Sequence, residues 1–219
     1  MTASRWLIPQ VDRKQAERLA EALDVSPAAA RVLLARGYRD PEAARGFLQP
    51  SLEDLAEPAL MLGMAPALAR LRRAIAAQEK ILLYGDYDVD GTTAVVILKT
   101  AIELAGGQAG FHIPHRLKDG YGMQTDVVER AAAEGVTLVV SVDTGIRAAE
   151  VVRRAGELGI DVIVTDHHPP ETELPPALAV LNPKQPGCPY PEKNLCGVGV
   201  AFKLVEALLE SLGWPPDKL

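Results

Sequence analysis

The sequence contains few cysteines and no long apolar run. Cys188 and Cys196 are the only two cysteines among 219 residues, too few for a disulfide framework, and their spacing does not fit a Cys-x-x-Cys site. No apolar stretch reaches the roughly 20 residues that a membrane-spanning helix needs, and the N-terminus has no basic segment followed by an apolar core. We therefore expect a cytoplasmic protein with reduced thiols and no membrane association.

An excess of basic charge is also absent. The formal net charge is −6, which argues against a protein that clamps nucleic acid with a generally basic surface. It does not exclude a nuclease, because bound divalent cations would offset a cluster of acidic ligands. The hydrophobic content of 48% is ordinary for a globular protein, so the chain is expected to fold around a substantial core.

From residue 80 the sequence alternates between short apolar runs and helical patterns. Strands are expected at 80–86, 108–114, 137–143, 161–166 and near 179–182, with helices at 92–105, 126–134, 147–158 and about 198–212. This alternation predicts an α/β fold, in which helices flank a parallel sheet and right-handed crossovers connect the strands.

The first 79 residues have a helical pattern without clustered chemistry. Ser26 and Asp40 each precede a proline and are expected to cap short helices at 28–35 and 41–48. We predict two domains, a small helical N-terminal region at 1–79 and an α/β domain at 80–219. The second domain is expected to be truncated at its C-terminal end, so that the chain is the front part of a longer protein.

An amphipathic helix expected at 65–78 carries Arg70, Arg72 and Arg73. These side chains could contact a phosphate backbone, or they could form a solvated helix face. The acidic total charge favours the solvated face.

Three aspartates at a spacing of two residues follow the first apolar strand. Asp86, Asp88 and Asp90 would point to one side of an extended chain, because side chains alternate between the faces of a strand. Their mutual repulsion favours a bound divalent cation, although Asp is also common in ordinary turns. An EF-hand is excluded, since the twelfth position from Asp86 is Ile97 rather than Glu. A P-loop is excluded because no Gly-Lys-Ser/Thr follows.

Two later strands end in the same kind of chemistry. One ends at Asp143, and the other is followed by Asp166, His167 and His168. Ligands of open α/β sheets bind beyond the carboxyl ends of the strands, so we expect these side chains to meet the three aspartates there. Mixed carboxylate and imidazole ligands suit Mn²⁺, and Mg²⁺ fits less well because it prefers oxygen. The combination predicts a two-metal site for phosphoryl displacement.

A polar loop follows the second strand at 114–122. Arg116 offers a bidentate phosphate donor, Lys118 a point charge, and Tyr121 a ring on which a base could stack. Because the loop lies at a strand end, we take these three residues and His115 as candidates for substrate binding. The same loop could equally be only a flexible connection.

These motifs, in this order, resemble those of the DHH phosphoesterase family. The similar segments are 86–91, 143–145 and 166–168, and the loop 114–122 and segment 197–202 resemble the RecJ branch of single-strand exonucleases. The resemblance implies metal positions at Asp86, Asp88, Asp143 and His167, with Asp143 bridging two ions. It further implies that Asp90, Asp166 and His168 orient ligands, position the scissile phosphate, or bind directly.

The resemblance implies an enzyme with two Mn²⁺ ions, or Mg²⁺ instead, that removes nucleotides 5′→3′ from single-stranded DNA in repair and recombination. Companions suggested by the family are a single-strand-binding protein, a helicase and a mismatch-repair factor. Family members carry a further metal-binding Asp, a DHHA1 domain and, in the RecJ branch, an OB-fold. This sequence has no match to them, so the segment alone is expected to bind metal weakly and to cleave little.

Two other functions stay open at this point. One is a DHH phosphatase for short oligonucleotides, cyclic dinucleotides or pyrophosphate, which the helical leader and the polar loop disfavour. The other is a non-catalytic scaffold of replication or repair with the same fold. Such scaffolds tend to lose acidic ligands, and this sequence keeps them.

Overall fold

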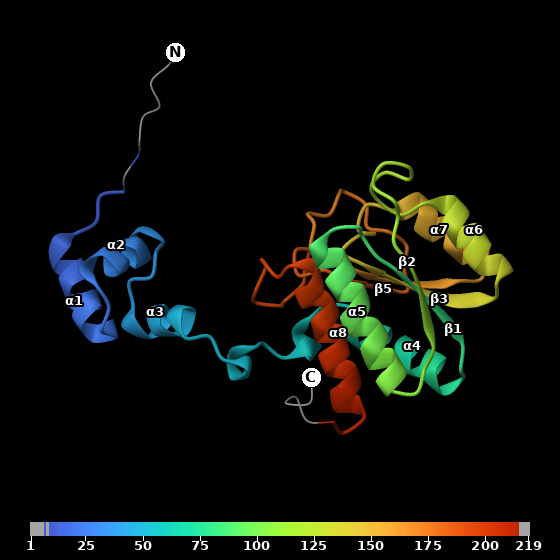
Figure 1. Ribbon diagram of the computed structural model, residues 1–219, viewed down its shortest axis with the longest axis horizontal. Coiled ribbons are helices and arrows are strands. Elements are labelled where there is room, and N and C mark those ends of the chain that lie inside the picture. Colours follow the sequence, from blue (N-terminus) through green and yellow to red (C-terminus); the bar gives the residue numbers. More distant parts are fainter. Residues whose placement is uncertain (1–6, 8, 215–219) are drawn as a thin grey trace, which may run out of the picture. The chain divides into compact units, whose positions relative to one another are not determined.

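The computed structural model describes residue 7 and residues 9–214. The outermost parts of both predicted domains, residues 1–6, 8 and 215–219, lie outside the described residues. The chain divides into two compact units, Met1–Leu55 and Ala56–Leu219 (Figure 1). In the described part of the chain, no helix combines the length and apolar character that crossing a bilayer requires.

The first unit is helical, as expected. It contains α1 (Arg13–Leu23), α2 (Pro27–Ala35), α3 (Pro41–Leu48) and the short 3₁₀ helix η1 (Leu52–Asp54). Both predicted caps are confirmed. Ser26 Oγ accepts a hydrogen bond from the Ala29 N–H at 3.2 Å, and Asp40 Oδ2 accepts one from the Ala43 N–H at 2.9 Å. Alanine and leucine side chains from the three helices form a small core of their own.

The second unit is built on a five-stranded parallel sheet, which confirms the predicted fold class. Its strands are β1 (Lys80–Tyr84), β2 (Ala109–His112), β3 (Val136–Val142), β4 (Asp161–Thr165) and β5 (Ala179–Leu181), in the order β2-β1-β3-β4-β5. The chain starts in β1, adds β2 on one side, and then continues with β3 on the other. This reversal creates a switch point between β1 and β3, where open α/β sheets bind their ligands.

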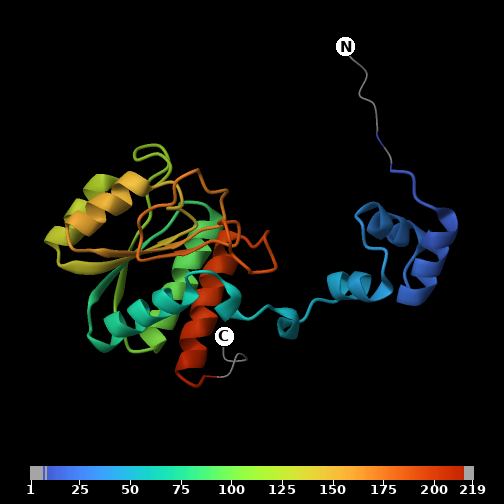
Figure 2. The same ribbon diagram turned by 180° about the vertical axis from the view of Figure 1, so that it is seen from behind.

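Helices cover both faces of the sheet (Figures 1 and 2). The helices on one face are α4 (Met64–Ala76), α5 (Val89–Leu104) and α8 (Gly197–Ser211), with the short η2 (Pro58–Leu60) before them; those on the other face are α6 (Thr125–Ala133) and α7 (Ala149–Glu157). In β3, Leu138, Val140 and Val142 pack in the core on the α5 side, whereas Val139 packs in the core on the α6 side. This alternation follows from the two-residue period of a strand.

Helix α4 packs on the sheet through residues such as Leu71 and Ala74, which are fully buried in the core of the second unit. The two compact units therefore divide after Leu55, N-terminal to α4. The predicted domain boundary at residue 79 stays a prediction.

The arginines of α4 have different environments, so the expectation of one solvated face is wrong for Arg70. This residue is 5% exposed, and its guanidinium lies 2.5 Å from the carboxylate of Asp161 and 2.6 Å from that of Glu79. A buried guanidinium needs such partners, because an unpaired charge in the core would be costly. Arg72 and Arg73 are exposed as expected.

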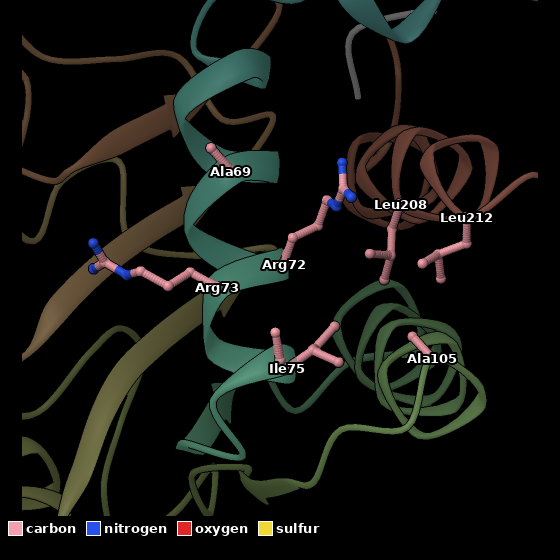
Figure 3. A pocket seen from close by; sticks show the side chains of 8 residues that line it. Ala69, Arg72, Arg73, Ile75, Ala105, Leu208 and Leu212 are labelled. Atoms are coloured by element: carbon pink, nitrogen blue, oxygen red, sulfur yellow. The ribbon is translucent and has the colours of Figure 1, made fainter.

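A groove of about 500 Å³ lies between α4, α5 and α8. Figure 3 shows Arg72 extending toward Leu208 of α8 and Arg73 extending away from that helix. Arg73 Nη2 lies 3.2 Å from Asp161, at the start of β4. Because Arg73 lines the groove and Asp161 is the first residue of β4, the groove lies near the amino ends of the strands. This is the end of the sheet opposite to the carboxyl ends of the strands.

Candidate metal centre

The predicted ligands follow the carboxyl ends of three neighbouring strands. Asp86 lies two residues after β1, Asp143 directly follows β3, and Asp166 directly follows β4. Because these strands are parallel and adjacent in the order β1-β3-β4, their ends bring sequence-distant side chains to one edge of the sheet. The edge coincides with the switch point between β1 and β3.

The acidic loop, residues 85–91, does not run as an extended strand. The expectation that its three carboxylates point to one side of an extended chain is therefore wrong. Helix α5 begins at Val89, three residues before the expected start at Thr92. Asp88 is its N-cap, and Asp88 Oδ1 accepts a hydrogen bond from the Gly91 N–H at 2.9 Å. A side chain that satisfies a free helical N–H stabilises a helix start. The Asp88 cap therefore starts α5 here, and the chain bends at residues 87–88 instead of continuing as an extended strand after Asp86.

Asp90 lies in the first turn of α5 and connects this helix to α8. Its two carboxylate oxygens accept hydrogen bonds from the backbone N–H groups of Gly197 and Val198, both at 2.6 Å. These are the first two residues of α8, where unpaired N–H groups and the helix dipole favour a negative charge. Both oxygens of Asp90 thus already have donors, which favours a structural role over metal ligation.

Two clusters of side chains that could hold a metal ion share one residue. Asp86, Asp88 and Asp143 form one cluster, and Asp143, His167 and His168 form the other; within each, one ligand atom per residue lies within 4.8 Å of the others. Asp143 is 1% exposed and has a backbone φ of 59°, a left-handed conformation that Asp tolerates better than most residues. His167 Nε2 lies 3.2 Å from Asp143 Oδ1 and 3.7 Å from Asp90 Oδ2.

The buried carboxylates have unsatisfied oxygens. Oδ1 of Asp86 and Oδ1 of Asp143 are both buried without a hydrogen-bond partner. Burial raises the pKa of Asp143 to about 8, with further contributions from the charges of Asp90 and Asp88, and burial also raises the pKa of Asp86. Unpartnered buried carboxylate oxygens beside an imidazole are the donor set that Mn²⁺ accepts. The residues at this edge therefore fit a divalent cation.

Asp166 and His168 form a separate hydrogen-bonded pair. Asp166 is 1% exposed, and its carboxylate accepts hydrogen bonds from the N–H groups of Ile146 and His167 at 3.0 and 2.7 Å. Its Oδ1 also lies 2.8 Å from Nδ1 of His168. Burial alone would raise the pKa of Asp166, but the hydrogen bonds from His168 and the backbone hold it below its usual value. The carboxylate therefore orients the His168 ring, a common arrangement behind metal-binding histidines.

The polar loop contributes Arg116 and Tyr121 to the rim of this centre. The Tyr121 ring lies edge-on to the rings of Tyr87 and His168, at centroid distances of 6.5 and 6.1 Å. The guanidinium of Arg116 lies over the Tyr87 ring, 5.2 Å from its centroid. Burial, with the carboxylates of Asp166, Asp86 and Asp143, raises the pKa of Tyr121 to about 12, so its hydroxyl stays a hydrogen-bond donor.

The other two candidates in the loop, His115 and Lys118, have no recorded contact with the metal centre among the described residues. His115 takes part in the local turn, since its Nδ1 accepts a hydrogen bond from the Leu117 N–H at 3.2 Å and its N–H donates to Asp119 at 2.7 Å. Lys118 is exposed. Among the described residues, the structure records no ion pair or hydrogen bond that joins either side chain to the metal centre. Their contact with substrate stays a prediction.

Two features of the site were not predicted from the sequence. Tyr87 lies between two of the aspartates, and its residue type and spacing alone do not distinguish it from an ordinary loop residue. The N-terminus of α8 was noted only as a family motif, although it supplies both donors to Asp90. A Cβ at Gly197 would overlap the carboxylate of Asp143, a requirement for glycine that depends on the folded arrangement and is not visible in the sequence.

Comparison with known proteins places these residues in a family context. RecJ of Bacillus subtilis, a single-stranded-DNA-specific exonuclease, is 45% identical over 98% of this chain and 27% of its own length. The Escherichia coli protein of the same name is 36% identical over 94% of this chain and 36% of its own length.

Solved structures give the same result. RecJ of Thermus thermophilus in complex with Mn²⁺ has a TM-score of 0.76 and 34% identity, covering 95% of this chain and 29% of its own. A further exonuclease RecJ bound to manganese has a TM-score of 0.66 and 39% identity, covering 71% of this chain and 40% of its own. The chain thus spans less than half the length of each of these relatives. A family model, the DHH family N-terminal domain, matches residues 80–218. Because this match covers more than half of the 219 residues, the chain belongs to the DHH family.

Proposed function

We propose that this chain is the N-terminal part of a RecJ-like exonuclease that removes nucleotides 5′→3′ from single-stranded DNA with two Mn²⁺ ions. The observation that carries the proposal is the pair of ligand clusters that share Asp143, whose buried Oδ1 has no hydrogen-bond partner. Similarity to manganese-bound RecJ structures supports the choice of metal, and Mg²⁺ is the alternative ion, since a related structure contains it.

In this proposal the chain's residues divide into three groups. The ions are held by Asp86, Asp88, Asp143 and His167. His168 is an additional ligand, because it belongs to the second cluster together with Asp143 and His167. Asp166 orients His168, and Asp90 holds α5 against the start of α8. When bound, the two ions would activate a water molecule and stabilise the attacking and departing oxygens of the phosphodiester.

The remaining residues would bind the DNA. Arg116 has a fork of N–H donors that matches a phosphate group. Tyr121 offers an aromatic face and a neutral hydroxyl at the same rim, and aromatic rings of this kind stack on bases without strong sequence preference. Single-strand-binding protein, helicase and mismatch-repair partners, and a location in the cytoplasm, stay predictions.

The central test replaces Asp143 with Asn in the full-length protein. Asn keeps the side-chain shape and tolerates the left-handed backbone at this position, but it removes the charge that two cations would share. Asp143→Asn is expected to lower Mn²⁺-dependent nucleotide release from 5′-labelled single-stranded DNA by at least about 10³-fold. The matched control is Asp126→Asn, an exposed aspartate on α6, which should leave release unchanged. Undiminished cleavage by Asp143→Asn would refute the proposal.

The same assay separates the exonuclease from a phosphatase for small substrates. Wild-type protein is given either a long single strand or a dinucleotide, at equal concentration of 5′ ends. The exonuclease should have the higher kcat/KM on the long strand. A preference for the dinucleotide, a cyclic dinucleotide or pyrophosphate would instead support the phosphatase.

A further inference from the structure

Tyr87 lies between the residues that would hold metal and those that would bind DNA. It follows Asp86 and precedes Asp88, and its side chain is half-buried. On one side the ring supports the guanidinium of Arg116 at 5.2 Å, and on another it meets the Tyr121 ring at 6.5 Å and an interplanar angle of 79°. A single aromatic ring therefore contacts both substrate-binding candidates of the polar loop.

Arg116 has little else to hold it. In the part of the chain that the structure describes, its guanidinium forms no ion pair and donates no hydrogen bond, in contrast to Arg147, which donates to the carbonyl of Pro169. The next residue, Leu117, is 89% exposed, so the loop tip gains little from burial. A guanidinium held over the face of the Tyr87 ring still has N–H groups that can donate to a phosphate.

The backbone of the loop is held independently of Tyr87, at its C-terminal end and by a turn within it. The Tyr84 hydroxyl donates to the carbonyl of Gly122 at 3.2 Å and accepts from the N–H of Gln124 at 3.1 Å. Within the loop, the Asp119 carboxylate accepts from the backbone N–H of His115 at 2.7 Å and closes a local turn. These bonds anchor the backbone but leave the Arg116 side chain without a fixed direction, because none of them involves its guanidinium.

We propose that Tyr87 is a positioning residue that holds Arg116 by a cation–π contact. In this position the guanidinium binds a phosphate of the DNA strand near the metal centre. The inference rests on the proposed function, because it assigns Arg116 to the substrate. Its specific content is that the aromatic ring, and not the hydroxyl, carries the effect. The contribution of Arg116 to DNA affinity should then depend on Tyr87, whereas the affinity for Mn²⁺ should not.

A double-mutant cycle tests this in the full-length protein with Tyr87→Phe, Tyr87→Leu, Arg116→Ala and the Tyr87→Leu/Arg116→Ala double variant. Two readouts are used: the Kd for a fluorescent 5′-phosphorylated single strand in EDTA, and KM and kcat with Mn²⁺. Tyr87→Leu is expected to raise Kd and KM roughly tenfold with little change in kcat. Tyr87→Phe should behave as wild type, and Arg116→Ala should add almost nothing when Tyr87→Leu is already present.

Two further measurements distinguish a positioning role from a general disturbance of the acidic loop. Mn²⁺ affinity, measured by titration, should be unchanged in both Tyr87 variants, and Val89→Ala, an 81% exposed neighbour in the same segment, should change neither Kd nor KM. The proposal is overturned if Arg116→Ala has its full effect in the Tyr87→Leu variant, if Tyr87→Phe is as weak as Tyr87→Leu, or if Mn²⁺ affinity falls. Absence of cleavage by the wild type would refute the proposed function instead, and the Kd arm would still decide the role of Tyr87.

Discussion

Asp143 is the buried carboxylate that both ligand clusters share. It is nearly fully buried, its Oδ1 has no hydrogen-bond partner, and its pKa is raised to about 8. Without a cation, the folded protein must either protonate this group or keep a buried negative charge beside other aspartates, with the His167 ring at 3.2 Å as its nearest imidazole. Ligand sites are often destabilising in this way, because the arrangement that binds metal is unfavourable when metal is absent.

The sign of the pH effect follows from the raised pKa. An unfolded chain releases the proton of Asp143 near pH 4, roughly its unperturbed pKa, whereas the folded, metal-free chain keeps it up to about pH 8. The stability contributed by the bound proton is therefore fully present below about pH 4 and is lost as the pH rises toward 8. Asn has no such titration, so the wild type should lose stability relative to Asp143→Asn over this range.

We predict that, in EDTA, Asp143→Asn raises the free energy of unfolding by about 1–3 kcal/mol at roughly pH 9 relative to the wild type. Near pH 5 the gain should be much smaller, because wild-type Asp143 is then still protonated in the folded state. Urea denaturation at the two pH values measures the difference. An Asn variant that is less stable than the wild type at both would show that burial of Asp143 is not the destabilising feature. Added Mn²⁺ should stabilise the wild type and not the variant.

At the scale of elements, the contact between α5 and α8 fixes the geometry of the centre. Asp90 of α5 accepts from the first N–H groups of α8, and the same end of α8 packs directly on Asp143. A Cβ built on Gly197 would lie 2.6 Å from Cγ and 2.7 Å from Cβ of Asp143, closer than atoms can pack. Only glycine therefore lets the helix start approach the shared carboxylate this closely.

Gly197→Ala is accordingly expected to displace Asp143 and to weaken Mn²⁺ binding by at least about tenfold, with a stability cost of about 1–3 kcal/mol from overpacking. The matched control is Gly199→Ala in the same helix. There a Cβ would meet the flexible Leu195 side chain at 3.3 Å, and the better helix propensity of alanine should offset the contact. Isothermal titration with Mn²⁺ and thermal unfolding compare the two. Equal Mn²⁺ affinity in both variants would contradict a positioning role for Gly197.

Elements and caps were predictable where the signal is local. The alternation of apolar runs and helical patterns gave the parallel sheet, and the Ser26 and Asp40 caps follow from neighbouring residues. The meeting of Asp86 with Asp143 was also predictable, because topology alone brings parallel strand ends together. Whether these side chains ligate metal stays a prediction.

One failure was local. The acidic loop is not extended, because the Asp88 side chain caps α5 and starts this helix early; a short Asp-rich segment is compatible with both a strand end and a helix start. The other failures depend on contacts between residues distant in sequence. The partner of Asp90 lies 107 residues away, and Arg70 is buried because Asp161, 91 residues away, pairs with it. Periodicity does not identify such partners, since they depend on how the helices pack.

At the scale of the whole molecule, the two compact units have separate cores. Each residue of the two ligand clusters lies in the second unit, after Ala56. The acidic edge that carries both clusters is therefore formed by the parallel sheet and its own helices, and α1–α3 contribute no side chain to either cluster.

The prediction that follows is that removal of residues 1–55 leaves the metal centre intact. In a chain that starts at Ala56, Mn²⁺ affinity should stay within about threefold of that of the complete chain, and saturating Mn²⁺ should raise Tm by a similar amount in both, because an ion that binds only the folded state stabilises it according to its concentration and Kd. Calorimetric titration and thermal unfolding with and without EDTA measure both quantities. The Asp143→Asn variant of each chain serves as the control that must lose the shift. A shortened chain that folds but binds Mn²⁺ more than about tenfold more weakly would show that the helical unit supports the centre after all.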